Sequence, residues 1–217
     1  SDWFSVDGTT KVTLGNKLVE PKSSELGTGY FKEAWSRTEI SPDMANVSVT
    51  HKGNSPSWGA LYLQYFEDMD KIQKSDGSLD IEKMMFIEET TPEGQRLVSV
   101  SEERALKVGD KVTVRLTVRS DRDMEFIHIK DLRASLFEPV IQVSGIKWQN
   151  GLIYYQASTD ASTNFYFDNL PKGTYVLEYS VYVTRRGSYS SGIATIQSMY
   201  APEFTSHTAG SRVEVID

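Results

Sequence analysis

The sequence predicts an all-β protein whose larger part is an antiparallel β-sandwich, preceded by a smaller β-rich unit. Two observations support this prediction. Apolar and polar residues alternate over several segments, which is the period of a half-buried strand. Turn-forming sequences such as Asn150-Gly151 and Pro171-Lys172-Gly173 separate these segments at the short intervals that are typical of a sandwich.

The first third of the chain is β-rich but less regular. We expect strands over residues 11–14, 29–35 and 46–51. Residues 57–68 form an apolar run that fits either a buried helix or a strand. Because its aromatic residues alternate and its helix caps are weak, we interpret this run as a strand.

A polar segment follows at residues 70–80 and contains the turn pair Asp76-Gly77. Polar, turn-forming segments of this kind are typical of domain boundaries. We therefore predict two units, a first over residues 1–75 and a second over residues 76–217.

The second unit shows the alternation most clearly. Lys111–Ser120 places Val112, Val114, Leu116 and Val118 on one face. Residues 174–183 repeat the pattern, and we expect Tyr175 to be a corner tyrosine whose hydroxyl bonds the backbone. Residues 146–156 predict a hairpin, since Asn150-Gly151 favours a type I′ turn. Shorter strands are expected at residues 164–167, 192–197 and 212–216, which gives a sandwich of about seven strands.

Length, charge and composition exclude several classes of protein. The 217 residues include no cysteine, which rules out a disulfide scaffold, a Cys-ligated metal site and a thiol nucleophile. The net charge of −7, with both signs interspersed, argues against a nucleic-acid partner. No apolar run is long enough to span a membrane. The chain begins without an initiator Met or a signal peptide, so we expect part of a longer protein.

The sequence holds no motif for catalysis, a metal or a nucleotide. His51, His128 and His207 stand outside any zinc spacing, and neither a nucleophile elbow nor a phosphate-binding glycine loop is present. Asp68, Asp70 and Asp76 lack the ligand order of a calcium loop and are interpreted as solvated linker acids. We expect no enzymatic activity, no cofactor and no metal. A carboxylate pair that only the fold brings together remains an open alternative.

The aromatic residues allow two interpretations. Tyr154-Tyr155, residues 165–167 and the four tryptophans (Trp3, Trp35, Trp58 and Trp148) could line a sugar-binding face. In a β-sandwich, however, such residues more often fill the core or an interface. The core interpretation is favoured, and a sugar-binding face is kept as the alternative.

Residues 198–210 do not resemble routine core sequence. An apolar strand ends at Met199 and Tyr200, and Pro202 makes its extension as a central strand unfavourable. One interpretation is an ordinary exit loop with two buried anchors. The other is a Met-Tyr tip presented to a partner, for which an adaptable and an amphipathic side chain are suited. The physical pattern alone favours the first.

Three segments, residues 106–140, 165–184 and 193–210, resemble the C-terminal end of bacterial alpha-2-macroglobulins. A Leu-Pro-x-Gly-Thr-Tyr turn and a Met-Tyr-x-Pro tail come in the order of that family's last macroglobulin-like domain, a sandwich of immunoglobulin-like architecture. Residues 28–35 and 58–72 resemble the second half of the CUB-like domain that precedes it. The resemblance covers most of the chain and implies that the first unit, a CUB-like unit, is incomplete here.

The resemblance implies a non-catalytic C-terminal module of a large protease inhibitor. In that family, cleavage of a bait region triggers a conformational change that entangles the protease, and in many members a Cys–Gln thioester then links to it. This chain has no cysteine and does not supply the thioester. In characterised bacterial relatives a Met-Tyr pair at this point helps to shield the thioester, and Met199 and Tyr200 match that pair. Without a thioester, the implied role of the pair is a domain contact.

The implied partners are the other domains of the same full-length chain, in particular a thioester domain, and the target proteases of the full-length protein. The implied location is the periplasm, the cell envelope or the extracellular space, with a lipid anchor outside this chain as one option. A free-standing adhesion or carbohydrate-binding sandwich stays open as the alternative. Selective binding on a glycan array would favour that alternative.

Overall fold

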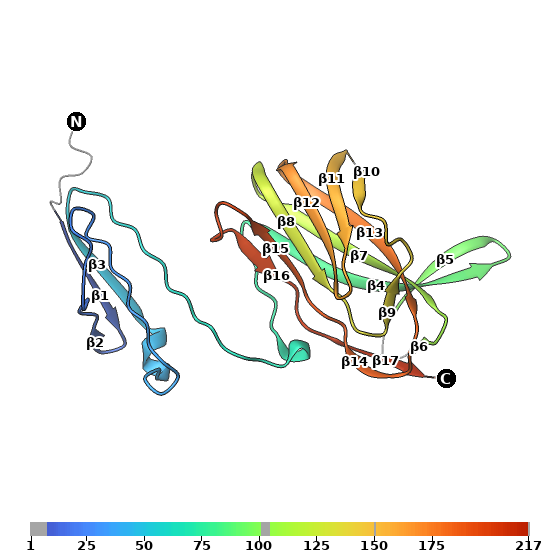
Figure 1. Cartoon of the computed structure of the whole chain (residues 1–217), viewed down its shortest axis with the longest axis horizontal. Coiled ribbons are helices and arrows are strands. Elements are labelled where there is room, and N and C mark those ends of the chain that lie inside the picture. The colour runs from blue at the N-terminus through green and yellow to red at the C-terminus, as the bar shows by residue number, and fades with distance from the viewer. Residues whose placement is uncertain (1–7, 101–104, 150, 217) are drawn as a thin grey trace. The chain divides into compact units, whose positions relative to one another are not determined.

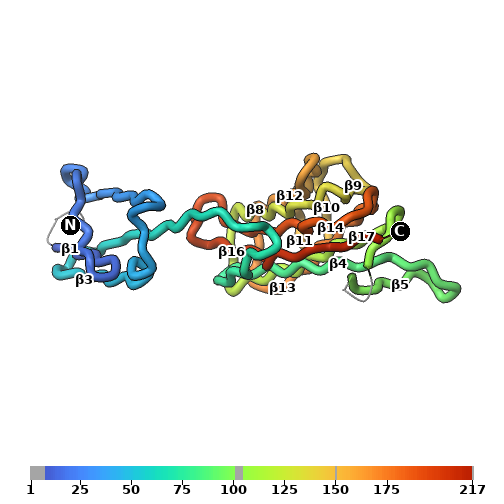
Figure 2. The backbone as a smooth tube through the Cα atoms, turned by 90° about the horizontal axis from the view of Figure 1, so that it is seen from below, coloured from blue at the N-terminus to red at the C-terminus, as the bar shows by residue number. Residues whose placement is uncertain are grey.

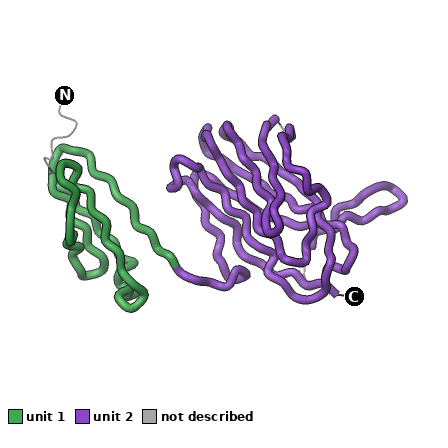
Figure 3. Tube along the Cα trace, in the orientation of Figure 1, with its two compact units in different colours: residues 1–64 green, residues 65–217 purple. Residues whose placement is uncertain are grey.

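The computed structural model describes residues 8–100, 105–149 and 151–216. The chain divides into two compact units, Ser1–Gln64 and Tyr65–Asp217, which Figure 3 colours separately. Strands dominate the described residues, whose helical elements are two 3-10 turns, η1 (Pro42–Ala45) and η2 (Met69–Lys71). The predicted all-β class is confirmed.

The first unit contains one small antiparallel sheet in the order β2-β1-β3. Its strands are β1 (Gly8–Leu14), β2 (Lys17–Leu18) and β3 (Val47–Gly53). Leu14 is the buried apolar residue of its described part. A sheet of this size with so little buried surface is marginal by itself.

Two strands expected in the first unit are absent from its described residues. Neither residues 29–35 nor residues 57–68 form a strand, and Trp58, Leu61 and Tyr62 are exposed. A strand is stable only when a neighbouring strand takes its backbone hydrogen bonds and a core covers one face. The strand predicted from the apolar pattern of residues 57–68 is therefore wrong, because this unit supplies neither a neighbouring strand nor a core to cover it.

The second unit is a sandwich of two main sheets (Figure 1). The six-stranded sheet has the order β10-β11-β12-β8-β15-β16. Its strands are β10 (Gly145–Gln149), β11 (Leu152–Ser158), β12 (Ser162–Leu170), β8 (Met124–Leu132), β15 (Ala194–Ser198) and β16 (Thr205–His207).

The five-stranded sheet has the order β5-β4-β7-β13-β9. Its strands are β5 (Gly94–Ser99), β4 (Leu79–Thr91), β7 (Lys111–Ser120), β13 (Gly173–Val183) and β9 (Phe137–Pro139). The hairpin of β4 and β5 extends beyond the other strands as an arm (Figure 1).

A third, small sheet closes one end of the sandwich. It consists of β14 (Gly187–Ser190), β17 (Arg212–Ile216) and β6 (Leu106–Lys107), with β17 in the middle. β14 and β17, which lie side by side in Figure 2, are antiparallel, whereas β17 and β6 are parallel.

The core lies between the two main sheets and is built from alternate residues of each strand. Leu116 on β7 and Leu177 on β13 face Ile129 on β8 and Phe165 on β12, and all four side chains are buried. Period-two patterning places one row of each strand on this inner face. The strands predicted at Lys111–Ser120 and residues 174–183 are confirmed as β7 and β13.

Other local predictions are also confirmed. The hairpin of β10 and β11 has Gly151 at φ 78°, while Asn150 lies outside the described residues. The Tyr175 hydroxyl donates to the carbonyl of Pro171 at 3.1 Å, as expected of a corner tyrosine. The strand expected at residues 192–197 begins later, at Ala194, because Gly192 has a left-handed backbone (φ 75°).

The segment before β4 is bonded to the second unit. Ser75 forms a β-bridge with His207, and the amide of Gly210 donates to the carbonyl of Ile72 at 2.9 Å. Arg212 pairs with Asp70 at 3.2 Å. The compact units accordingly divide after Gln64. The assignment of residues 1–75 to a CUB-like unit and of 76–217 to the sandwich domain stays a prediction.

Candidate interdomain contact site

Met199 and Tyr200 lie in the short loop that joins β15 to β16 at one end of the six-stranded sheet. Their side chains are 57% and 79% exposed. Neither is a buried anchor, so the interpretation of this segment as an exit loop with two buried anchors is wrong. The loop presents both side chains to the solvent.

The rest of the loop is held in place. The amide of Ser198 donates to the carbonyl of Phe204 at 3.0 Å, and the amide of Phe204 donates to the carbonyl of Ala201 at 2.9 Å. The Phe204 ring packs against the core and is covered on its outer side by Arg122, 5.5 Å from the ring centre. Phe204, rather than Met199 or Tyr200, therefore anchors the loop.

Phe126 supports the tip from the neighbouring strand. Its carbonyl accepts a hydrogen bond from the amide of Met199 at 2.9 Å, and its ring meets Tyr200 edge-to-face at 5.0 Å between centres. Phe126 has φ 52°, an uncommon and costly conformation for a bulky residue. Phe126 was not predicted from the sequence, because no local motif marks a left-handed residue inside a strand.

The aromatic clusters split between the core and the surface, as alternation dictates. Tyr154, Phe165 and Phe167 are buried, whereas Tyr155 and Tyr166 between them face outward. The favoured core interpretation is thus right for one row and wrong for the other. Trp148 is 82% exposed, Trp58 is exposed and stacks on Tyr30, Trp35 is half-buried, and Trp3 lies outside the described residues.

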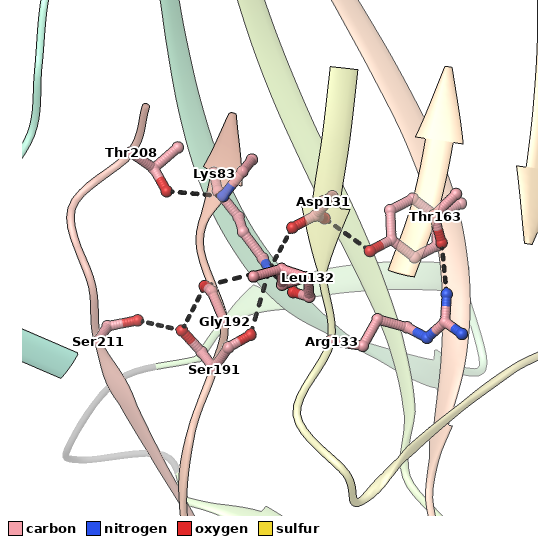
Figure 4. Close-up of polar contacts among 11 residues, drawn as sticks. Lys83, Asp131, Leu132, Arg133, Thr163, Ser191, Gly192, Thr208 and Ser211 are labelled. Atoms are coloured by element: carbon pink, nitrogen blue, oxygen red, sulfur yellow. Dashed lines mark hydrogen bonds and ion pairs between the residues drawn. The ribbon is translucent and has the colours of Figure 1, made fainter. Parts of the chain in front are cut away.

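The sandwich encloses one polar network that sequence reasoning did not predict. The ammonium of Lys83 on β4 lies 2.6 Å from the Asp131 carboxylate on β8, and it also donates to the carbonyls of Leu132 and Ser191 at 3.0 and 3.2 Å (Figure 4). Tyr179 on β13 donates to the other Asp131 oxygen at 2.6 Å. The pair thus joins the two main sheets through the core.

This network is closed to the solvent. The Lys83 and Asp131 side chains are 7% and 0% exposed. Burial raises the pKa of Asp131 against the opposing effect of Lys83, and burial followed by the neighbouring Asp131 raises the pKa of Tyr179 well above its usual value. Acceptors surround the lysine and no substrate can reach it, so the arrangement is a structural link between sheets.

The remaining candidates form no site among the described residues. His128 stacks on Tyr166 and bonds Asn164, and no group of three potential metal ligands is found in the part of the chain that the structure describes. Asp68, Asp70 and Asp76 each pair with a lysine or an arginine. Within the same residues, no helix has the length and apolarity that crossing a membrane would require.

The fold defines a class, the macroglobulin-like β-sandwich domain. The family model for the bacterial alpha-2-macroglobulin MG10 domain matches residues 79–203, which is more than half of the chain. The chain therefore belongs to the bacterial alpha-2-macroglobulin family. A comparison with curated protein sequences gave no match.

Solved structures of this family share the fold. Salmonella alpha-2-macroglobulin reacted with methylamine is 19% identical over 79% of this chain, with a TM-score of 0.52. The trypsin-activated Escherichia coli protein is 17% identical over 67%, and the elastase-activated one 14% identical over 97%, both with TM-scores of 0.53. This chain spans 10%, 11% and 18% of those three chains.

Proposed function

We propose that this chain is a non-catalytic C-terminal module of a bacterial alpha-2-macroglobulin-like protease inhibitor. Its task is to make contacts with other domains of the full-length chain. Met199 and Tyr200 are the contact residues, and in a full-length protein with a thioester they shield it from water and amines. The proposal places the protein in the periplasm, the cell envelope or outside the cell.

The observation that carries this proposal is the exposure of Met199 and Tyr200 on a loop that is otherwise fixed. Side chains that stabilised the sandwich itself would pack against its core, as the half-buried Phe204 does in the same loop. The exposed Met199 and Tyr200 side chains are instead suited to a contact that excludes water. Family membership supplies the neighbouring domains that such a contact needs.

The first unit fits the same proposal as the second half of a CUB-like domain. Its sheet leaves the outer edges of β2 and β3 unpaired in the described residues, and Trp58, Leu61 and Tyr62 have no core to enter. A segment from elsewhere in the full-length chain would complete it.

The experiment is the double substitution Met199→Ala with Tyr200→Ala. In the 217-residue chain, the melting temperature should change by no more than roughly 2 °C, because exposed side chains contribute little to stability. In the thioester-bearing full-length protein, the same change should speed inactivation by methylamine several-fold.

The matched control replaces an exposed Met and an exposed Tyr on the other main sheet, Met84→Ala with Tyr182→Ala. This pair should leave the rate of methylamine inactivation unchanged. A fall in melting temperature of the size caused by a core cavity, or equal inactivation rates for the two double variants, would contradict the proposed role of Met199 and Tyr200.

A further inference from the structure

The outer face of the six-stranded sheet carries a row of apolar and aromatic side chains. Cross-strand register places five of them on one face, since Trp148 pairs with Ile153, Tyr155 with Tyr166, and Tyr166 with His128. Phe126, two residues before His128 on β8, is also exposed. We call this row the apolar band. Its members are Trp148, Ile153, Tyr155, Tyr166, His128 and Phe126.

The apolar band extends across the six-stranded sheet from the edge strand β10 to β8 and reaches the β15–β16 loop through Phe126. Tyr155 and Tyr166 lie 6.4 Å apart between ring centres, and Tyr166 stacks on His128 at 4.6 Å. Phe126 follows on the same strand as His128 and meets Tyr200 at 5.0 Å. The band is therefore continuous with the contact residues proposed above.

The band is large and largely uncovered by the described part of the chain. Trp148 and Ile153, at its far end, are 82% and 65% exposed. None of its members is Asp, Glu, Lys or Arg, and single-sided apolar rows of this kind mark contact surfaces. Two possible occupants, a glycan and a protein surface, place different demands on the rings.

The ring geometry disfavours a glycan. A sugar-binding platform needs ring faces that are open to the solvent, but the face of Tyr166 is stacked on His128 with only 5° between the planes. Tyr155 is tilted by 46° to Tyr166, so the rings form no flat platform. Aliphatic Ile153 beside Trp148 adds no hydrogen-bonding group. Rings packed against one another suit the apolar surface of a protein domain.

We infer that the apolar band is buried against another domain of the same full-length chain, the domain that also contacts Met199 and Tyr200. This inference rests on the proposed function. The continuity through Phe126 and Tyr200 means that a domain seated on the loop lies next to the band. This chain spans only 10% to 18% of the solved relatives, so most of each relative lies outside the matched part and could include such a domain.

The test is hydroxyl-radical oxidation of the isolated 217-residue chain and of the full-length protein, read residue by residue by mass spectrometry. We expect the oxidation of Trp148, Ile153 and Tyr155 to fall several-fold in the full-length protein. Met84 and Tyr182, exposed on the other main sheet, are the internal controls and should keep their rates. Equal rates for the band in both proteins would overturn the inference.

Met199 and Tyr200 are read in the same experiment, which separates the inference from the proposed function. If they are protected and the band is not, the inference is wrong and the proposed function stands. If the band is protected and they are not, the burial of the band is supported, but both the proposed role of the Met-Tyr pair and its sharing of one domain with the band are contradicted.

Two further arms address other occupants on the isolated chain. Protection of Trp148 that rises with protein concentration, with a matching dimer in sedimentation, would overturn the inference in favour of a second copy. Protection by chitohexaose or cellohexaose would overturn it in favour of a glycan. Unchanged oxidation in both arms supports it.

A charge placed in the band tests whether an apolar domain surface covers it. Trp148→Lys in the full-length protein should restore the oxidation of Ile153 and Tyr155 toward the rates of the isolated chain, because burying an unpaired lysine is costly. Tyr182→Lys is the matched control and should change neither rate. Full protection that persists in Trp148→Lys would show that no apolar domain surface covers the band.

Discussion

On the outer face of the five-stranded sheet the charged side chains lie in pairs, whereas the outer face of the six-stranded sheet carries the apolar band. Arg115 Nε lies 2.6 Å from Glu178 Oε1, and Lys111 Nζ lies 2.8 Å from Glu88 Oε2. Arg115 also covers the ring of Phe86, at 4.7 Å. The first face thus pairs these charged groups within its own strands and covers Phe86, while the second leaves more aromatic surface exposed.

This difference separates stability from function within one sandwich. A face whose partners all lie in the chain should respond to substitution with a change in the free energy of unfolding. On a face whose proposed partner lies outside the chain, a substitution should weaken the contact with that partner and leave the free energy of unfolding nearly unchanged. Substitutions on each face, and in the buried Lys83–Asp131 pair that joins the two sheets, test that separation.

The largest effect is expected for Lys83→Met, which removes the link between the two sheets. Asp131 would be left buried without its cation, which costs about 3–5 kcal/mol and lowers the melting temperature by roughly 10 °C. Lys83→Met combined with Asp131→Leu should recover much of the loss, because no buried charge then remains. Denaturant unfolding measures both. A double variant as unstable as the single one would contradict the ion-pair explanation.

On the polar face, Glu88→Gln should destabilise the chain by about 1–2 kcal/mol. The Glu88 carboxylate accepts hydrogen bonds from the hydroxyls of Thr113 and Ser180 at 2.6 and 3.0 Å and pairs with Lys111. Glu93→Gln in the exposed β4–β5 turn is the control, with a change within about 0.5 kcal/mol. Equal effects of the two substitutions would contradict the prediction that the contacts of Glu88 stabilise the polar face.

The same carboxylate gives the polar face a dependence on acid. Burial alone would raise the pKa of Glu88, but the hydrogen bonds from Lys111, Thr113 and Ser180 outweigh it and lower the pKa below the usual 4.5. The stabilisation is therefore present above about pH 4.5 and is lost as the pH falls through the lower folded-state pKa. Melts between neutral pH and about pH 3 should show the difference between wild type and Glu88→Gln shrinking with acid.

The smallest effect on stability is expected on the apolar face. Trp148→Ser with Ile153→Thr removes a cross-strand pair that is open to the solvent, so the free energy of unfolding should change by about 0.5 kcal/mol or less. Leu116→Ala in the core, at a cost of about 3 kcal/mol, sets the scale. A loss as large as that of Leu116→Ala would show that the band stabilises the chain itself.

The sequence predicted the strands whose alternation is unbroken and missed those in which a polar residue faces the core. Lys111–Ser120 is regular and was predicted correctly, whereas no strand was predicted over Leu79–Thr91, whose inward row includes Lys83. Alternation cannot show that a lysine has a buried aspartate as its partner forty-eight residues later. The expected seven strands fell short of the eleven in the two main sheets for this reason and because short edge strands such as β9 and β16 carry little pattern.

The candidate site was predictable in part. The residues Met199 and Tyr200 came from the resemblance to a family, while the physical pattern alone favoured burial, which is wrong. Exposure depends on where a strand ends, and the hydrogen bonds of Ser198 and Phe204 decide that. The apolar band was visible only as aromatic clusters, since the choice between Tyr154 and Tyr155 for the inner face depends on register.

Phe126 has a consequence for any redesign of this chain. Its left-handed backbone (φ 52°) is strained for phenylalanine and free of steric strain for glycine. A procedure that optimises stability alone would therefore place glycine or asparagine at this position and gain from it. That choice would delete the ring against which Tyr200 rests. Improving the thermostability of the isolated module and keeping its surface fit for assembly are thus conflicting aims at residue 126, and an engineered version should keep this phenylalanine fixed.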